Sequence, residues 1–245
     1  MSTVAVLQAR MTSTRLPGKV LRPIVGKASL HHQIARIQRA ADLDGVIVAT
    51  TVNASDDPIV RLADDLGIPC FRGDEHDVLG RFQNAIAATD AKVVVRLTGD
   101  CPLTDPSIID HIIRARSDSN ADYASNTLER SYPIGMDVEA FTREALEQAD
   151  RSAETNDERE HVTPYIYRNP ELFTLHNVVA PDSARLPDLR LTLDTEEDLR
   201  LITAVFEALY PENPLFSLGD ILAFLVQNPD LRNINRDVAH KWLDT

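Results

Sequence analysis

A polar loop over residues 8–19 gathers three cationic side chains in a chain whose formal net charge is −13. The loop follows a continuous apolar run, residues 4–7, which is typical of a strand buried on both faces of a parallel sheet. Arg10 and Arg15 offer planar forks that match phosphate oxygens, and Lys19 offers a compact charge. Short hydroxyl residues leave backbone amides open to an anion. We interpret the loop as a phosphate-binding loop; the alternative is a solvated basic turn.

Two carboxylates also follow apolar runs. Asp100 comes after residues 92–97, and Asp194 comes after residues 191–193 and before a capped helix. Ligands collect at the carboxyl ends of strands in open α/β sheets, and carboxylates that face a triphosphate there suit Mg²⁺. Asp100 and Asp194 are therefore predicted metal ligands. The alternatives are a turn cap for Asp100 and a helix-start acid for Asp194.

A third polar group lies between these two acids in the sequence. The spacing of Asp137 and Glu139 puts both on one face if the segment is a strand, and Gly135 lets backbone approach a ligand closely. The free pKa of His161 is near neutrality, so its imidazole could activate a hydroxyl; the alternative for Glu160 and His161 is an ion pair on a helix surface. The residues predicted to line the substrate side are Asn126, Gly135, Asp137, Glu139, Arg159, Glu160 and His161.

Helix and strand patterns alternate along the chain, which indicates a mostly parallel sheet. Further strands are expected at residues 46–49, 68–71, 92–97, 121–125, 138–141, 173–179 and 189–193. Ser29 is the expected N-cap of the first helix, and helices are also expected near residues 57–66, 78–88, 106–113 and 143–149. Capping boxes predict helices after Thr155, Thr195 and Ser217, the first running through Tyr167 despite Pro164.

Composition limits the class of protein. A chain of 245 residues with 43% hydrophobic residues fits one α/β domain over residues 1–245, with an irregular excursion at about 126–188. The acidic balance argues against nucleic-acid and anionic-membrane surfaces. The sequence has neither an apolar run that would span a bilayer nor a signal-peptide pattern, and Cys70 and Cys101 lack metal-ligand spacing. We therefore expect a cytoplasmic protein.

Residues 8–19, Q-A-R-M-T-S-T-R-L-P-G-K, resemble the signature of the CMP-sugar-acid synthetases. That group holds CMP-Kdo synthetase and acylneuraminate cytidylyltransferase, and the resemblance is greatest to the branch of spore coat polysaccharide biosynthesis protein F. Residues 98–102, T-G-D-C-P, and 194–199, D-T-E-E-D-L, resemble its two metal-binding motifs, and residues 159–161, R-E-H, resemble a run typical of that branch. The resemblance implies a nucleotide-diphospho-sugar transferase-like, Rossmann-like three-layer fold with a mixed, mostly parallel sheet.

The resemblance also implies an activity, a CTP-dependent cytidylyltransferase. CMP would pass from CTP to a sugar acid or related anionic sugar, with Mg²⁺ as cofactor and pyrophosphate released, in surface polysaccharide or glycoconjugate biosynthesis. Arg10, Arg15, Lys19 and Asp100 would be catalytic. The nucleotide-binding residues would be Gln8, Ala9, Arg10, Ser13, Arg15, Lys19, Arg72, Asp77, Leu79 and Thr98.

A homodimer is also expected, with Ile134, Met136 and Val138 as candidates for an isologous contact. The acceptor motifs of the neuraminic acid and Kdo enzymes are not found in their usual form, so the resemblance predicts the reaction better than the acceptor.

Two other functions are alternatives to cytidylyl transfer. A glycosyltransferase of the same broad fold would usually hold its metal with D-x-D, whereas this chain has Gly99-Asp100-Cys101; the other alternative is a non-catalytic CTP-binding protein.

Overall fold

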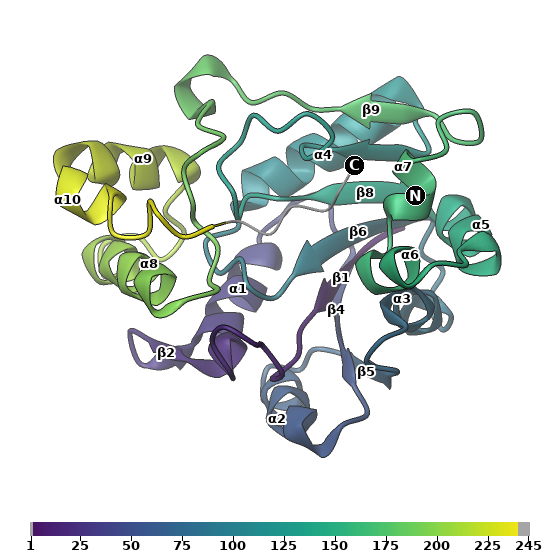
Figure 1. Ribbon diagram of the computed structural model, residues 1–245, viewed down its shortest axis with the longest axis horizontal. Helices are drawn as coiled ribbons and strands as arrows, with labels where there is room; N and C mark the ends of the chain where they lie inside the picture. The colour runs from purple at the N-terminus through teal and green to yellow at the C-terminus, as the bar shows by residue number, and fades with distance from the viewer. Residues whose placement is uncertain (1, 240–245) are drawn as a thin grey trace.

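The computed structural model describes residues 2–239 and centres on a seven-stranded sheet in the order β5-β4-β1-β6-β8-β7-β9 (Figure 1). β8 runs antiparallel to β6 and β7, and the other neighbouring strands are parallel. This confirms the predicted mixed, mostly parallel sheet. The strands are β1 (Thr3–Gln8), β4 (Gly45–Thr51), β5 (Cys70–Gly73), β6 (Val93–Thr98), β7 (Tyr123–Ser125), β8 (Glu139–Thr142) and β9 (Leu175–Asn177); a separate hairpin pairs β2 (Pro23–Ile24) with β3 (Lys27–Ala28).

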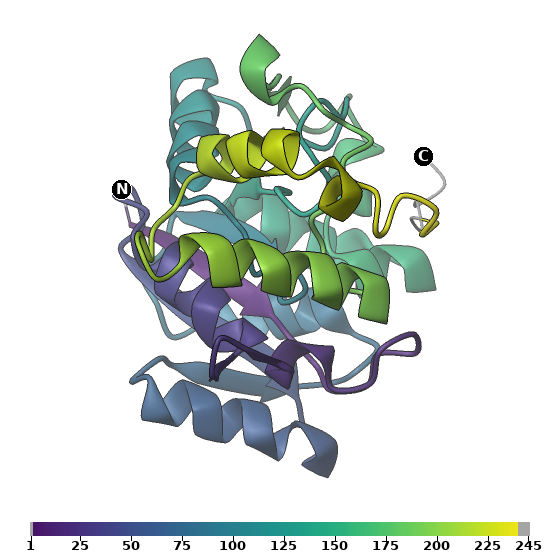
Figure 2. The ribbon, with the colours of Figure 1, turned by 90° about the vertical axis from the view of Figure 1, so that its left-hand side faces the viewer.

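Helices cover both faces of the sheet. In Figure 1, α1, α8 and α9 lie on one side and α3, α5 and α6 on the other, and Figure 2 shows α8 and α9 one above the other on the first side. The helices are α1 (Ser29–Ile37), α2 (Asp57–Asp65), α3 (Val78–Ile86), α4 (Pro106–Ser119), α5 (Arg143–Ser152), α6 (Asn156–His161), α7 (Pro164–Tyr167), α8 (Glu196–Leu209), α9 (Leu218–Gln227) and α10 (Pro229–Arg232), with short 3₁₀ turns η1 (Lys19–Leu21), η2 (Ala54–Asp56) and η3 (Asp182–Ala184). No helix among residues 2–239 is long and apolar enough to cross a bilayer.

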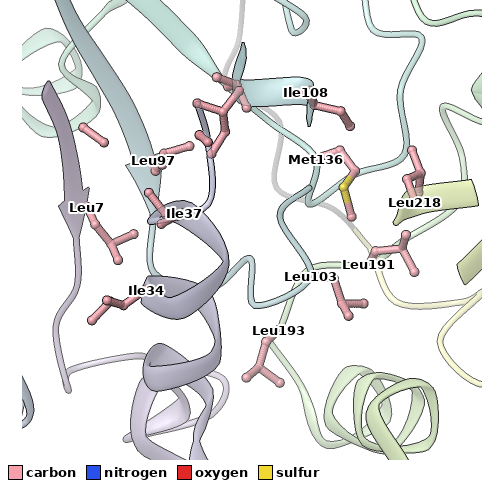
Figure 3. Close-up of a cluster of buried hydrophobic side chains, with 14 of the residues drawn as sticks. Leu7, Ile34, Ile37, Leu97, Leu103, Ile108, Met136, Leu191, Leu193 and Leu218 are labelled. Carbon is pink, nitrogen blue, oxygen red and sulfur yellow. The ribbon is translucent and has the colours of Figure 1, made fainter. Parts of the chain in front are cut away.

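The apolar run of β1 is explained by burial on two sides. Ala5 and Leu7 pack into the core that includes α1, α4 and α8, while Val4 and Val6 pack into the core that includes α3 and α5. Because successive side chains of a strand point to opposite faces, both sets must be apolar when both faces are covered. Figure 3 shows part of the first core, where Leu7 lies beside α1.

The order of the strands creates a crevice beside β1. The chain steps from β1 to β4 and β5 in one direction, and then returns to place β6 on the other side of β1. Ligands bind at such a switch point in open α/β sheets. Gln8 lies opposite Thr98, where both strands end, and the N–H of Gly99 donates to the Gln8 carbonyl at 2.8 Å. A Cβ at Gly99 would lie 2.9 Å from that carbonyl oxygen, so the close approach requires glycine.

Residues 189–193 do not form the predicted strand of the sheet. Their only β-bridge within the described chain joins Arg190 to Ile134. The segment is nevertheless held in place, because the N–H of Leu191 donates to the Ile134 carbonyl and the N–H of Leu193 to the Asp100 carbonyl, each at 2.7 Å. These bonds bring the chain before Asp194 alongside Asp100.

Most predicted helix starts are confirmed. The capping boxes at Thr155, Thr195 and Ser217 are present. The predicted Ser29 cap is wrong, since the N-cap residue is Ala28 and Ser29 is the first residue of α1. The helix predicted from Thr155 through Tyr167 is also wrong. It ends at His161, because Val162 adopts a left-handed φ of 72°, and α7 begins at Pro164, where proline fits a helix start.

The stretch expected as an excursion, residues 126–188, supplies β8, β9 and three helices to the architecture. Ile134, Met136 and Val138 are 5%, 0% and 0% exposed and belong to the core. In Figure 3, Met136 lies close to Leu191 and Leu218. The prediction that these three residues form a dimer contact is therefore wrong, because packing within the chain already buries them.

Candidate active site

A cleft of about 730 Å³ opens where β1 and β6 end. Residues from the loop after β1, the loop after β6 and the segments before β8 and after α6 surround it. Predicted site residues among its lining are Gln8, Ala9, Arg10, Ser13, Arg15, Lys19, Thr98, Asp100, Asp137, Glu139, Glu160, His161 and Asp194. The topology therefore gathers both predicted metal ligands and the loop cations around one cavity.

The loop over residues 8–19 is held in shape by two carboxylates from neighbouring loops. Asp56, which is 1% exposed, accepts a hydrogen bond from the Met11 N–H at 2.8 Å. Glu75 accepts from the Thr12 hydroxyl at 2.7 Å and lies 3.5 Å from the Arg10 guanidinium. Gly18 closes the loop, donating its N–H to the Met11 carbonyl at 2.9 Å with a left-handed φ of 70°. Hydrogen bonds within the protein thus fix the shape of the loop.

Lys19 joins the two predicted metal ligands. Its Nζ lies 2.9 Å from Asp100 Oδ2 and 2.6 Å from Asp194 Oδ1. Burial alone would lower the pKa of Lys19, but the two carboxylates raise it. Burial alone would likewise raise the pKa of Asp100, but the Lys19 ammonium holds it well below its usual value. The three groups therefore stay charged at neutral pH.

Asp194 has two further cationic partners. Its Oδ2 lies 2.8 Å from an Arg15 nitrogen and 2.6 Å from Nη2 of Arg190. Burial and the nearby Asp100 would raise the pKa of Asp194, whereas Lys19 and then Arg15 lower it, and the pKa is lowered overall. Arg15 and Lys19, which both belong to the loop over residues 8–19, therefore contact the same carboxylate.

The pair Asp100 and Asp194 fits a hard divalent cation. The Lys19 ammonium between them stands in for that cation, since it shows that both carboxylates can serve one positive charge. No cluster of three or more histidine, cysteine or acidic side chains suited to a metal occurs among the residues described. Two carboxylates are nonetheless sufficient for Mg²⁺ when phosphate and water oxygens supply its other ligands.

The acids on the opposite wall are neutralised by arginines. Glu139, 7% exposed, accepts from the Tyr123 and Thr163 hydroxyls, each at 2.6 Å, and pairs with Arg96. Asp137 pairs with both terminal nitrogens of Arg130, at 2.6 and 2.8 Å. Glu139 is thus held by three protein donors while it lines the cleft, and its contact with the acceptor stays a prediction. The cleft carries little unbalanced negative charge on this wall.

Glu160 and His161 lie at the end of α6 on the rim of the cleft. Glu160 is 3.9 Å from the Arg10 guanidinium across the opening, and His161 Nε2 is 3.8 Å from Asp157. Burial, followed by the charge of Arg96, lowers the pKa of His161 below its usual value. Its imidazole is therefore neutral at pH 7 and can accept a proton.

Arg72, Asp77 and Leu79, three of the predicted nucleotide-binding residues, do not line the cleft. Arg72 donates to the Thr51 and Asn53 carbonyls, each at 2.8 Å, Asp77 caps α3, and Leu79 is 0% exposed in the core. Each of the three is therefore engaged within the protein, Arg72 with backbone carbonyls, Asp77 at the start of α3 and Leu79 in the core. Val78 and Arg81, from the same segment, line the cleft instead.

Three predicted acceptor residues also have structural roles outside the cleft lining. Asn126 is 0% exposed, and its side-chain amide bonds the backbone of Met136 and Val138. Gly135 lies against residue 191, where a Cβ would be 2.6 Å from backbone. Arg159 pairs with acids of other helices, Asp77 at 2.6 Å and Asp150 at 2.8 Å. The prediction for these three is therefore corrected.

Sequence reasoning missed Arg81, Arg96 and Arg130, all of which line the cleft. A signal existed for Arg96, because it is a charged residue inside the apolar run Val93-Val94-Val95-Arg96-Leu97. A buried charge of this kind needs a partner, which marks the position as special. Arg130 lies between Glu129 and Ser131, where no such contrast distinguishes it, and Arg81 follows Val78-Leu79-Gly80 in a segment that also holds Gln83 and Asn84.

Comparison with known proteins gives consistent results. Residues 4–222 match the family described as Cytidylyltransferase. MJ1063 of Methanocaldococcus jannaschii is 38% identical over 241 residues, which cover 98% of this chain and 97% of the relative. Spore coat polysaccharide biosynthesis protein SpsF of Bacillus subtilis is 37% identical over 230 residues, which cover 92% of this chain and 94% of the relative. A solved structure of a cytidylyltransferase from Leptospira borgpetersenii superposes with a TM-score of 0.90 at 31% identity, covering 98% of this chain and all of the other.

Proposed function

The chain belongs to the cytidylyltransferase family, and we propose that it transfers CMP from CTP to a sugar acid or related anionic sugar. The similarity to SpsF over nearly the whole chain supports a role in polysaccharide biosynthesis. One observation carries the assignment of the site: Lys19, Asp100 and Asp194 meet within 2.9 Å at the mouth of a loop rich in cations.

In the proposed reaction, a hydroxyl oxygen of the acceptor attacks the α-phosphorus of CTP. The bond between the α-phosphorus and the bridging oxygen breaks, and pyrophosphate leaves with the electron pair. Lys19 and Arg15 would neutralise charge on the triphosphate, and Arg10 would assist from the far side of the loop. Catalysis would then depend mostly on positioning and electrostatics, as is usual for phosphoryl groups. His161, neutral at pH 7, is the proposed acceptor of the hydroxyl proton.

Asp100 and Asp194 are the residues that would hold Mg²⁺. A bound divalent cation supplies charge stabilisation at the phosphate oxygens and favours loss of the hydroxyl proton. The same carboxylates contact Lys19, so a divalent cation held by them would compete with the ammonium. We propose that Lys19 would then contact the phosphate oxygens. Its ammonium would thereby exchange carboxylate partners for phosphate.

The charge balance of the opposite wall supports an anionic acceptor. Arg96 and Arg130 already neutralise Glu139 and Asp137, so an incoming carboxylate does not meet unpaired acids there. A pocket with unbalanced acids would repel such a substrate, because like charges interact strongly where water is excluded. Glu160, whose side chain is 51% exposed, can remain hydrated at the rim.

The test is a pyrophosphate-release assay with each of the four NTPs and a panel of sugar acids, neutral sugars and polyol phosphates. We expect release with CTP and a sugar acid, and none with the Asp100→Asn variant. Release with neutral sugars alone would contradict the acceptor class. Transfer from a nucleotide sugar without pyrophosphate would instead support a glycosyltransferase, and CTP binding without any release would support a binding protein.

We also propose that the protein is a homodimer that works in the cytoplasm. The free thiols Cys70 and Cys101 support a reducing compartment. The dimer must use a surface other than Ile134, Met136 and Val138, which are buried. Light scattering at micromolar concentration should give about twice the chain mass of 27.2 kDa, and a value near 27.2 kDa would contradict the dimer.

A further inference from the structure

Behind the cleft, Asp194 is backed by three buried polar side chains. Arg190, Asp198 and Asn235 are 4%, 0% and 2% exposed. Arg190 precedes Asp194 by four residues, Asp198 follows it by four in the first turn of α8, and Asn235 comes from the segment after α10. The group therefore joins the C-terminal part of the described chain to a predicted metal ligand.

Arg190 is shared between two carboxylates. Its Nη2 donates to Asp194 Oδ2 at 2.6 Å and to Asp198 Oδ2 at 3.1 Å, and its Nε donates to Asp198 Oδ1 at 2.9 Å. Asp198 also accepts the backbone N–H groups of Asp194 and Thr195, at 2.9 and 3.0 Å. The position of the guanidinium against Asp194 consequently depends on where Asp198 is held.

Asn235 adds a further donor that holds Asp198 in this position. Its Nδ2 donates to Asp198 Oδ1 at 2.8 Å and to the Arg190 carbonyl at 3.0 Å. One amide nitrogen thus ties the start of α8 to the extended segment that carries Arg190. The same C-terminal segment also touches the phosphate loop, since Arg15 donates to the Ala239 carbonyl at 3.2 Å.

We propose that Asn235 is a positioning residue for Asp194, acting through Arg190 and Asp198. With Asp198 anchored, Arg190 holds Oδ2 of Asp194 from behind, and Oδ1 faces the cleft, where it now meets Lys19. Without Asn235, the guanidinium can follow Asp198, and its hold on Asp194 loosens. Partners that orient metal ligands contribute about 10- to 100-fold in metal affinity or activity. The inference rests on the proposed metal role of Asp194.

The experiment compares Asn235→Ala with a matched control, Asn233→Ala, an exposed asparagine of the same segment. Free Mn²⁺ is measured by electron paramagnetic resonance in the presence of saturating CTP and without acceptor. We expect Mn²⁺ to bind about tenfold more weakly to Asn235→Ala and unchanged to the control. Calorimetric titration of CTP in EDTA should give wild-type affinity for both. Asn235→Ser, which keeps one hydroxyl donor, should recover part of the Mn²⁺ affinity, and it replaces the alanine variant if that variant does not fold.

Equal Mn²⁺ affinity in Asn235→Ala and Asn233→Ala would overturn the inference. A parallel loss of CTP affinity in EDTA would also overturn it, because Asn235 would then support the whole cleft rather than the carboxylate. If the wild-type protein itself fails to bind Mn²⁺ with CTP, the proposed metal site fails together with this inference. That outcome is recognised because the wild type and the control fail as well.

Discussion

Replacing Lys19 by methionine removes the ammonium that joins Asp100 and Asp194. The side chains of these residues are 12%, 27% and 11% exposed, so the pairs are mostly buried. A hydrogen bond to a charged group contributes about 1.5–3 kcal/mol, and Asp194 keeps Arg190 as a partner. We therefore expect Lys19→Met to lower the free energy of unfolding in EDTA by about 2–3 kcal/mol, chiefly because Asp100 loses its cation.

The same substitution should strengthen metal binding in the absence of nucleotide. In the wild type a divalent cation must displace the ammonium, whereas in the variant the two carboxylates are open to it. If the variant avoids about 1.4 kcal/mol of the free energy needed to displace the ammonium, Mn²⁺ binds about tenfold more tightly to Lys19→Met. Mn²⁺ should also restore more stability to the variant than to the wild type, because it binds the folded state selectively.

Urea unfolding in EDTA and in Mn²⁺, together with calorimetric titration of Mn²⁺, checks both effects. Lys27→Met is the matched control, since Lys27 is an exposed lysine outside the cleft lining. The pKa values of Asp100 and Asp194 are lowered and that of Lys19 is raised, so the stability advantage of the wild type should be full between about pH 4 and 10.4 and decline outside this window. The reasoning is refuted if Lys19→Met is as stable as Lys27→Met in EDTA, or if its Mn²⁺ affinity is unchanged.

Four further predictions concern single residues. Asp100→Asn should lower kcat by about 100-fold or more in the pyrophosphate assay, and near-normal turnover at saturating Mg²⁺ would contradict its role. Arg15→Ala should weaken CTP binding by about 1.5–3 kcal/mol and CMP binding less, as titrations with both nucleotides can show. Glu139→Gln should lower the free energy of unfolding by about 3 kcal/mol in urea, because it leaves Arg96 buried without its anion. His161→Ala should raise the KM for the acceptor, while its CTP affinity stays within about threefold of the wild type. In the wild type, kcat/KM should fall on the acid side below pH 6.5, since burial and Arg96 lower the pKa of His161.

The sequence was most informative where local chemistry determines structure. The apolar run of β1 needs two covered faces, and the acids after β6 and before α8 follow from strand ends and helix caps. The capping box at Thr195 was visible because its two partners are three residues apart. Positions of this kind could be predicted without knowledge of the rest of the chain.

Other features depended on contacts between distant segments. Arg72 and Leu79 are predicted to bind the nucleotide, but Arg72 bonds backbone carbonyls and Leu79 is buried in the core, which the local sequence does not reveal. Residues 189–193 look like a strand, yet they hydrogen-bond to loop residues and not to a strand of the sheet. Asn235 carried no local signal, since its partners Arg190 and Asp198 lie 45 and 37 positions earlier.

The contacts of the cleft also have a consequence for how the protein becomes active during folding. Lys19 and Asp194 are 175 positions apart, and Arg15 and Ala239 are 224 apart. Contacts of such high sequence separation form slowly, because the chain must close long loops before it gains their energy. A chain emerging from the ribosome therefore has the loop over residues 8–19 long before it has Asp194. Activity should be acquired only once nearly the whole chain has been synthesised, so fragments left by interrupted translation or proteolysis should retain no transferase activity.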